Sequence, residues 1–248
     1  MKWHRLIIIA VLLFSTTAFG QGFRRQEPLR QFAYGAKIGM NVTNMRLTEE
    51  CYKIYDHQFI PYPALGAWFQ YRSESGFVIR PELTLCGRGS QITCHDVIYR
   101  VSSTCLNFRI NLQLHMYIPR TTKSMYIVAA PSWNATVEGH VYFSSEDIPS
   151  LLMDLSSSSM HVHDMNVFVG MGFETPIFAI GRTLYLSGEA GYSFCLTNSF
   201  TEAELTNNVT VLNNLLYSHP NMGSRIFSGI EASVRIGIPF GKKIRIRR

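Results

Sequence analysis

Two histidines and an aspartate, in the order His161, His163 and Asp164, have the spacing that comes closest to a reactive site. Histidines two positions apart share one face of an extended strand, so both rings could bind one metal ion. The neighbouring serines, Ser156–Ser159, also suggest a Ser/His hydrolase. Either chemistry needs a third ligand or a group that orients the base, and no spacing supplies one. The sequence therefore favours a polar surface loop here and predicts no catalytic residue, no metal site and no cofactor.

The N-terminus has the pattern of a secretory signal peptide. A basic start precedes a nine-residue apolar run, 6–14, and the small residues Ala18 and Gly20 occupy the −3 and −1 positions of the expected cleavage site. The run is too short to cross a bilayer comfortably as a helix. We predict that residues 1–20 are a cleaved signal peptide. An exported protein seldom meets nucleic acid, so no nucleic-acid partner is expected.

Five cysteines offer covalent chemistry in an exported chain: Cys51, Cys86, Cys94, Cys105 and Cys195. All fall in predicted long loops or at strand ends on one rim, and export permits disulfides. No C-x-x-C spacing occurs, which argues against a zinc site. The odd number leaves at least one thiol unpaired within the chain. We predict one loop-stapling disulfide among Cys86, Cys94 and Cys105, with its pairing left open.

The composition limits the fold that could hold these residues. Of the 248 residues, 16% are charged, against about 25% in ordinary soluble domains, and 46% are hydrophobic. The formal net charge is +6. These values argue against a disordered chain and against a densely charged surface. No segment after the signal peptide reaches about 18 consecutive apolar residues, so a membrane-embedded chain would have to be a closed β-barrel.

Apolar and polar residues alternate strictly over Leu106–Ile118. This period of two has no helical interpretation, and a strand that crosses a bilayer needs about 9–11 residues. Seven other segments have similar patterns, although 64–72 is the weakest. The eight predicted strands are 34–42, 64–72, 77–85, 106–118, 125–135, 167–174, 184–196 and 225–240.

The connections between these strands alternate in length. The short ones are 73–76, 119–124 and 176–182, and the long ones are 43–63, 87–105, 136–164 and 197–222. Short turns on one rim and long loops on the other are typical of outer-membrane barrels. We therefore predict an all-β fold, an eight-stranded antiparallel up-and-down transmembrane β-barrel with four long extracellular loops. The predicted parts are a periplasmic N-terminal segment at 21–32, the barrel at 33–240 and a basic periplasmic tail at 241–248.

Alternation alone also fits a soluble lipocalin, whose barrel has apolar residues inside. Here the polar face consists of Gly, Ser, Asn and charges that nearly cancel, which favours an enclosed lumen. Its charged residues are Lys37, Arg80, Arg109, Arg225 and Arg235, with Glu82, Glu174, Glu189 and Glu231. Side chains fill the interior of an eight-stranded barrel, so we predict a plugged barrel and not a pore.

Aromatic residues near the predicted strand ends are expected to form interfacial girdles, as in other membrane barrels. They are Trp68, Tyr126, Trp133, Phe178, Tyr192, Phe194 and Phe240.

Several stretches resemble a known family. They are Tyr34–Asn41, Leu106–Pro119, Val169–Glu174, Gly188–Tyr192 and Val234–Phe240. Together they resemble the small outer-membrane β-barrel proteins of Bacteroidota, the porin-like, PorT-type family. The resemblance implies an outer-membrane location, no cofactor, and envelope or secretion-complex proteins, of type IX in one branch, as partners. One departure is that eight residues follow Phe240, whereas such barrels usually end on an aromatic residue.

These observations predict a non-enzymatic, monomeric outer-membrane barrel with a plugged lumen. It would contact outer-membrane lipid and lipopolysaccharide and act as an envelope structural or interaction protein, with a secretion accessory as one form of that role. Two alternatives stay open. One is an outer-membrane enzyme that hydrolyses lipid or peptide with loop residues such as His161 and His163. The other is a soluble lipocalin-like carrier.

Overall fold

A computed structural model describes most of the chain as β-strands. The described residues are 29–46, 56–94, 97–119, 121–144, 151–154, 163–179, 181–197 and 226–244. The strands are β1 (Leu29–Arg46), β2 (Asp56–Arg72), β3 (Phe77–Cys94), β4 (Val97–Tyr117), β5 (Ser124–Ser144), β6 (Leu151–Asp154), β7 (His163–Ala179), β8 (Arg182–Cys195) and β9 (Ile226–Ile244). Over these residues, no helix has the length and apolar character needed to span a membrane. The predicted signal peptide, Cys51 and His161 lie outside the described residues.

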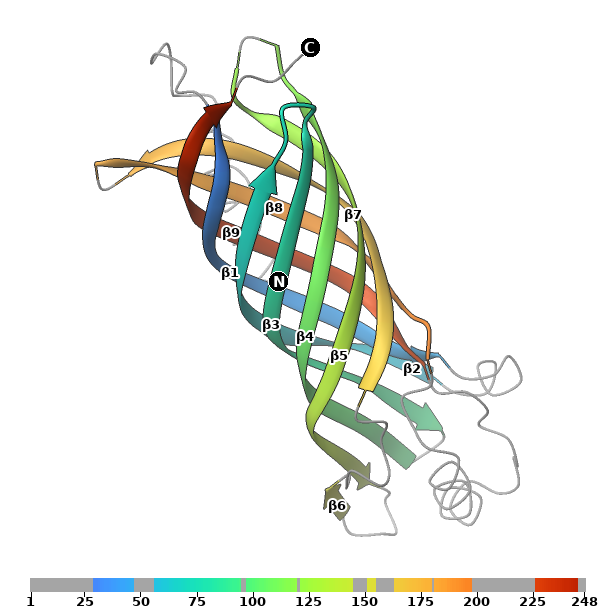
Figure 1. The fold of residues 1–248 in the computed structure, drawn as a ribbon. Helices are drawn as coiled ribbons and strands as arrows, with labels where there is room; N and C mark the ends of the chain where they lie inside the picture. Colours follow the sequence, from blue (N-terminus) through green and yellow to red (C-terminus); the bar gives the residue numbers. More distant parts are fainter. Residues whose placement is uncertain are drawn as a thin grey trace, which may run out of the picture.

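Eight of the strands close into a ring (Figure 1). The order is β4-β3-β2-β1-β9-β8-β7-β5, and pairing of β4 with β5 completes it. Every pairing is antiparallel. The short strand β6 pairs with β5 at residues 140–143, outside the ring. The predicted eight-stranded antiparallel barrel is confirmed.

The wall is apolar on the outside and polar on the inside. Along β4, the outward side chains from Leu106 to Leu114 are 37–49% exposed, whereas the intervening polar ones, Asn107 to Gln113, are at most 5% exposed. A lipocalin has the opposite arrangement, with its apolar residues inside. The soluble-carrier alternative therefore does not fit this barrel.

Three strands continue past the point where this pattern ends. Leu85 and Leu106 are the last outward apolar pair of β3 and β4, and Cys86 and Cys105 face each other next. Farther along, polar inward residues such as Ser90 and Ser103 give way to apolar ones that are at most 2% exposed: Ile92, Tyr99 and Val101. Most of the outward ones are polar, among them Gln91, Arg100, Ser102, Glu138 and His140, whereas Val137 is an exposed apolar residue. The outward apolar surface of the wall, which we call the apolar belt, therefore ends at the level of Leu85 and Leu106.

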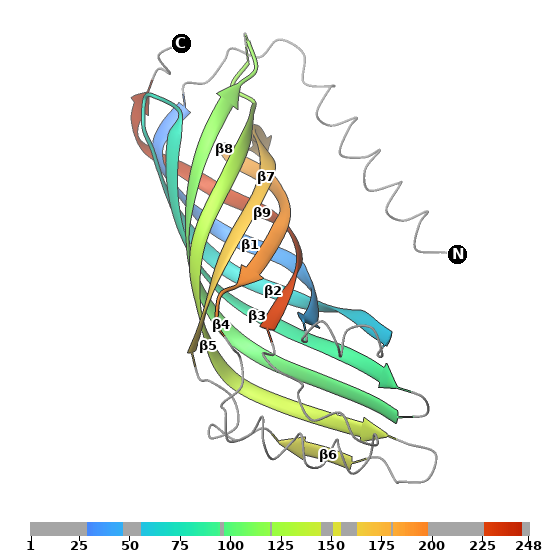
Figure 2. The ribbon, with the colours of Figure 1, turned by 90° about the vertical axis from the view of Figure 1, so that its right-hand side faces the viewer.

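We call the continuing part, residues 87–94, 97–104 and 137–144 with β6 and the start of β2, the extension sheet (Figure 2). It corrects the predicted loops. Residues 87–105 were expected to be a loop, yet β3 and β4 pair without a register shift up to Cys94 and Val97. The expected loops 43–63 and 136–164 also begin and end as strand. The physical reason is that alternation continues here with reversed polarity, so a search for outward apolar residues ends too early.

The ends of the barrel also differ from the predicted boundaries. β1 begins at Leu29, four residues before 33, and β9 continues beyond Phe240 to Ile244. The reason is that the two strands pair along this whole length, from Leu29 opposite Ile244, with an irregularity between Arg30 and Phe32. At the same end, Gly76 turns the β2–β3 connection with a φ of 86°, a conformation that favours glycine.

Candidate functional site

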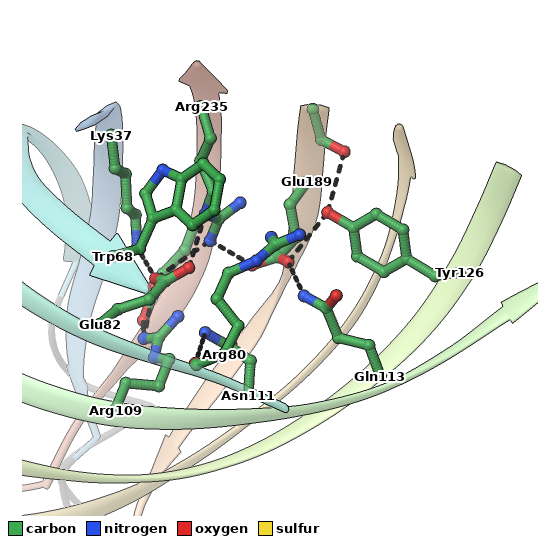
Figure 3. A network of polar contacts seen from close by, with 12 residues as sticks. Lys37, Trp68, Arg80, Glu82, Arg109, Asn111, Gln113, Tyr126, Glu189 and Arg235 are labelled. Carbon is green, nitrogen blue, oxygen red and sulfur yellow. Dashed lines mark hydrogen bonds and ion pairs between the residues drawn. The ribbon is translucent and has the colours of Figure 1, made fainter. Parts of the chain in front are cut away.

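The centre of the lumen holds a charged cluster that joins four strands (Figure 3). Lys37 Nζ of β1 lies 3.0 Å from Glu82 Oε2 of β3. Arg235 Nε of β9 lies 2.6 Å from Glu82 Oε1, and its Nη2 lies 2.7 Å from Glu189 Oε1 of β8. All four side chains are buried. Buried charges need paired and hydrogen-bonded partners, and this cluster provides them from opposite parts of the wall.

A second charged layer lies nearer the end of the barrel that carries the short turns 73–76 and 118–123, which we call the short-turn end. Glu174 of β7 pairs with Arg72 of β2 and accepts a 3.3 Å hydrogen bond from Arg80 Nη2 of β3. Arg80 Nε also donates to Gln70 Oε1 at 3.0 Å, and Arg72 Nη1 donates to the Tyr117 hydroxyl at 2.5 Å. This layer connects β2 and β3 to β7 on the far side of the ring.

A third layer lies toward the extension sheet. Arg109 Nη2 of β4 lies 2.6 Å from Glu231 Oε2 of β9. Arg88 of β3 pairs with Asp164 of β7, and Asn134 Nδ2 donates to Asp164 Oδ1 at 2.7 Å. The three layers together leave the lumen filled with paired side chains.

The short-turn end of the lumen closes with apolar contacts. Its cluster consists of Leu29, Ala33, Trp68, Tyr185 and Ile244, all buried. Trp68 Nε1 donates to the Ala36 carbonyl at 3.0 Å, and the Arg80 guanidinium lies 5.1 Å from the Trp68 ring. These buried side chains lie beyond the charged layers, at the end with the short turns.

Two predicted girdle residues lie inside the barrel and not at its outer surface. Trp68 belongs to the apolar cluster, and Tyr126 stacks on His115 with 4.7 Å between ring centroids. The prediction for these two is wrong because both rings occupy inward positions of their strands. Tyr126 also donates to Glu189 Oε2 at 3.1 Å. Each ring has a polar partner in the lumen, which makes burial of a large amphipathic side chain favourable.

The alternation predicts most of the lumen charges and misses three. Arg72 lies at the end of the weakest predicted strand, and Arg88 and Asp164 lie in segments predicted to be loops. The signal for Arg88 was available, since it continues the inward phase of Arg80 and Glu82 along β3. Arg225, which was expected to face the lumen, lies outside the described residues.

The residues suggested for metal binding or hydrolysis are separated by the fold. His163 and Asp164 are consecutive in β7, so their side chains point to opposite faces. Asp164 is buried against Arg88, whereas the His163 ring stacks on Trp133 at 4.9 Å. Over the described ranges, no group of three His, Cys, Asp or Glu side chains could hold a metal ion. The geometry thus gives Asp164 a structural partner, and the ring contact of His163 within the described residues is with Trp133.

The strand register shows which of the described cysteines face each other. Cys86 and Cys105 lie directly opposite each other on β3 and β4, and both are buried. These two and Cys195 are free thiols in the structure. The Cys94 side chain lies outside the described part. The predicted disulfide therefore remains a prediction, now with one candidate pair in register.

A small polar cavity remains beside the third charged layer, toward the extension sheet. Its volume is about 30 Å³, and Thr84, Asn107, Arg109 and Glu231 line it. About two water molecules fit in that space. Thr84 Oγ1 and Arg109 Nε are buried there without a hydrogen-bond partner among the described residues. The cavity suits bound water and is far too small for a lipid or a sugar.

No protein-family model and no curated protein sequence matches the chain. Among solved structures, Neisserial surface protein A covers 86% of this chain and 100% of its own, with 10% identity and a TM-score of 0.41. The outer membrane protein OprG from Pseudomonas aeruginosa covers 88% and 99%, with 9% identity and a TM-score of 0.39. Ail, the attachment invasion locus protein of Yersinia pestis, covers 83% and 99%, with 7% identity and a TM-score of 0.34. None of these comparisons supports the resemblance to the PorT-type family, and at these scores the assignment of the barrel depends on its own strand pairing.

Proposed function

We propose that the chain is a non-conducting outer-membrane β-barrel that presents its extension sheet to other components of the cell envelope. The observation that carries the proposal is the apolar belt around a lumen filled with ion pairs. Every strand of the ring contributes exposed apolar side chains to this belt, among them Ile38, Leu65, Leu83, Leu112, Ile127, Met171, Phe194 and Ile236. An apolar surface of this extent is unfavourable in water and favourable against lipid.

The two ends of the barrel support one orientation. Short turns at 73–76 and 118–123 lie at the end that carries Leu29 and Ile244, and the extension sheet lies at the other. In outer-membrane barrels the short turns face the periplasm and the longer segments face outside. In this orientation we expect the extension sheet to lie at the cell exterior and to contact lipopolysaccharide and envelope proteins.

The lumen contacts support a plugged barrel. Ion flow would require water to replace the contacts of Glu82 with Lys37 and Arg235, and those of Glu174 with Arg72. Removing one partner of a buried pair costs about 3–5 kcal/mol, so spontaneous opening is rare. We therefore expect the purified, monomeric protein in a planar lipid bilayer to show no steady conductance. Stepwise channels from the wild-type protein would contradict the plugged lumen.

The features of the extension sheet support its proposed role in binding other components of the cell envelope. Its outward face carries polar residues such as Arg100 and Glu138, together with the exposed apolar side chains of Phe59 and Val137. Its outermost described strands, β6 and residues 56–59 of β2, have a partner on one side only among the described residues. An unpaired strand edge can accept a strand of another protein. The resemblance to the PorT-type family makes a secretion complex one specific partner to test.

A photo-crosslinking residue at Arg100 tests this role in intact cells. We expect a discrete protein adduct from this position and none from the matched position Leu112 in the apolar belt. Mass spectrometry of the adduct would identify the partner, and a secretion-complex subunit would support the finer assignment. Equal adducts from both positions, or none from Arg100, would contradict the interaction role of the sheet.

A further inference from the structure

Two neighbouring strands separate at the short-turn end of the wall. β8 and β9 pair from Ser193 and Gly229 to Tyr185 and Gly237, and there the pairing stops. Over the part of the chain that the structure describes, β9 continues to Ile244 paired with β1 alone. The β7–β8 hairpin also continues, to the pair Ala179 and Arg182, but its last residues no longer pair with β5 or β9. Figure 1 shows the tip of this hairpin projecting beyond the rest of the wall.

Proline explains where the separation begins. Pro239 lies two positions after Gly237, the last residue of β9 that pairs with β8, and Pro176 lies two positions after Glu174, the last residue of β7 that pairs with β5. Proline has no backbone N–H, so it cannot donate to a ladder and favours a strand edge. The hairpin then turns at Gly181, whose φ of 69° is left-handed. The sequence therefore encodes the opening on both sides of the hairpin.

The opening forms a cleft of about 390 Å³ between the hairpin and the paired ends of β1 and β9. We call it the wedge. Its lining is part apolar and part polar: Leu29, Phe178, Ile238 and Pro239 form the apolar part, and the polar part includes Thr183 and Tyr185 with the cations Arg30 and Arg182. No carboxylate is among the described residues that line it. A cleft that combines apolar side chains with two guanidinium groups fits an amphipathic anion.

An aromatic cluster on the outer wall indicates the depth in the membrane at which the wedge lies. Phe240 of β9 stacks on Phe32 of β1 at 5.5 Å, and Phe32 lies 5.6 Å from Tyr71 of β2. Aromatic rings gather at the level of the lipid headgroups in membrane barrels. Because Phe240 follows Pro239 directly, the wedge opens at that level. Lys242 and Lys243, exposed at the end of β9, add further positive charge beside it.

One cation of the wedge is held in place. Arg30 N donates to the Tyr185 hydroxyl at 2.8 Å, and Arg30 Nη1 donates to the Gly241 carbonyl at 2.9 Å. These contacts leave other N–H groups of the guanidinium available, since it carries five donors. Beyond Gly237, the edge of β9 that faced β8 has no strand partner among the described residues, so its backbone groups need partners at the membrane boundary.

We propose that the wedge binds one anionic glycerophospholipid of the periplasmic leaflet. Its phosphate accepts hydrogen bonds from Arg30 and Arg182, because guanidinium groups match phosphate oxygens in charge and geometry. One acyl chain lies along Phe178 and Ile238. The inference rests on the membrane location proposed above and adds a specific lipid site to it.

The test uses phosphatidylglycerol as the probe, with the full-length protein in nanodiscs of phosphatidylcholine that contain a small fraction of phosphatidylglycerol. Native mass spectrometry of the released protein measures the retained lipid. We expect one phosphatidylglycerol per barrel, and at least a tenfold loss of occupancy in R30Q/R182Q. The matched control R100Q removes an exposed arginine at the opposite end and should leave occupancy unchanged. Equal occupancy in wild type and R30Q/R182Q would overturn the proposal.

Further measurements separate the contribution of the acyl chain to binding from that of the phosphate, and loss of binding from loss of the folded barrel. F178Q removes apolar contact and keeps both arginines, so we expect it to lower occupancy and leave the folded barrel intact. If inorganic phosphate competes fully with the lipid, the site recognises only a phosphate ion and the lipid proposal is wrong. Heat-dependent gel mobility of each variant reports the barrel itself. A folded, membrane-inserted barrel that retains no lipid would refute the lipid site in the wedge and leave the proposed function standing. A protein absent from membranes would refute the proposed function.

Discussion

Arg235 and Glu82 face each other across the lumen, and each makes two contacts with the other. Arg235 Nε lies 2.6 Å from Glu82 Oε1, and Arg235 Nη2 lies 3.1 Å from Oε2. The residues belong to β9 and β3, which β1 and β2 separate in the ring. Both side chains are 0% exposed. This pair ties the two halves of the wall together at the centre of the barrel, and it also blocks the lumen.

Loss of the Glu82 charge should therefore destabilise the barrel. Glu82→Gln leaves Arg235 and Lys37 without their shared counter-charge, and we expect the free energy of unfolding to fall by about 3–5 kcal/mol. Urea titration of the protein in lipid vesicles measures this change. Glu138→Gln, an exposed carboxylate of the extension sheet, is the control and should change stability by less than about 0.5 kcal/mol. Equal effects would show that the central cluster does not stabilise the barrel.

The apolar belt predicts a position-specific penalty for charge. Leu112 points outward in the middle of β4, and Leu112→Arg should cost about 2–4 kcal/mol and reduce assembly into the membrane. Leu112→Ala removes the same side chain without adding charge, so it should assemble normally. Quantitative blotting of outer-membrane fractions measures both. Normal assembly of Leu112→Arg would mean that this face does not contact lipid.

Asp164 provides a test between a structural and a catalytic role for the segment at the start of β7. Asp164→Asn should lower the free energy of unfolding by about 3 kcal/mol, because Arg88 loses its charged partner. His163→Ala removes only a ring that stacks on Trp133 and should have a much smaller effect. Neither variant should change the lipid or peptide products of the envelope. A change in those products with His163→Ala at normal stability would revive the hydrolase alternative.

The cysteine pair predicts a selective oxidation. Cys86 and Cys105 are cross-strand neighbours, and directly opposite side chains on antiparallel strands lie near the distance of a disulfide. Diamide should therefore oxidise the two thiols to one disulfide, with both hydrogens transferred to the reagent. Alkylation and peptide mass spectrometry should find Cys195 still free. The C86S variant should leave Cys105 open to alkylation, and a bond from Cys105 to any other cysteine would contradict the register.

Much of the wall could be predicted from sequence because its outward face is long and regular. Leu106–Ile118 alternates without interruption, and lipid contact requires that pattern on every strand. The charges of Lys37, Glu82 and Glu189 were assigned to the lumen for the same reason. Their pairing was not predictable, since Arg235 and Glu82 are 153 positions apart and meet only through ring closure. Pairing of lumen charges depends on strand register around the whole barrel, which alternation within one strand does not encode.

The extension sheet and the wedge were missed for two different reasons. In the extension sheet, the inward positions become apolar at Ile92 and Val101, so the outward signal disappears while the strands continue. At the wedge, Pro239 lies within a segment that alternates well, and the pattern gives no sign that β8 leaves β9 there. Proline was a usable signal at this position, because it marks a strand edge.

The most direct test of the central claim, an apolar wall around a filled lumen, is the gel mobility of the native protein. The protein is extracted with detergent from fractionated envelopes and run with and without heating. We predict recovery in the outer-membrane fraction and a shift in mobility on heating, because a closed barrel stays folded in detergent until it is heated. Recovery in the soluble periplasm without detergent, with no shift on heating, would contradict the assignment of the apolar face to lipid.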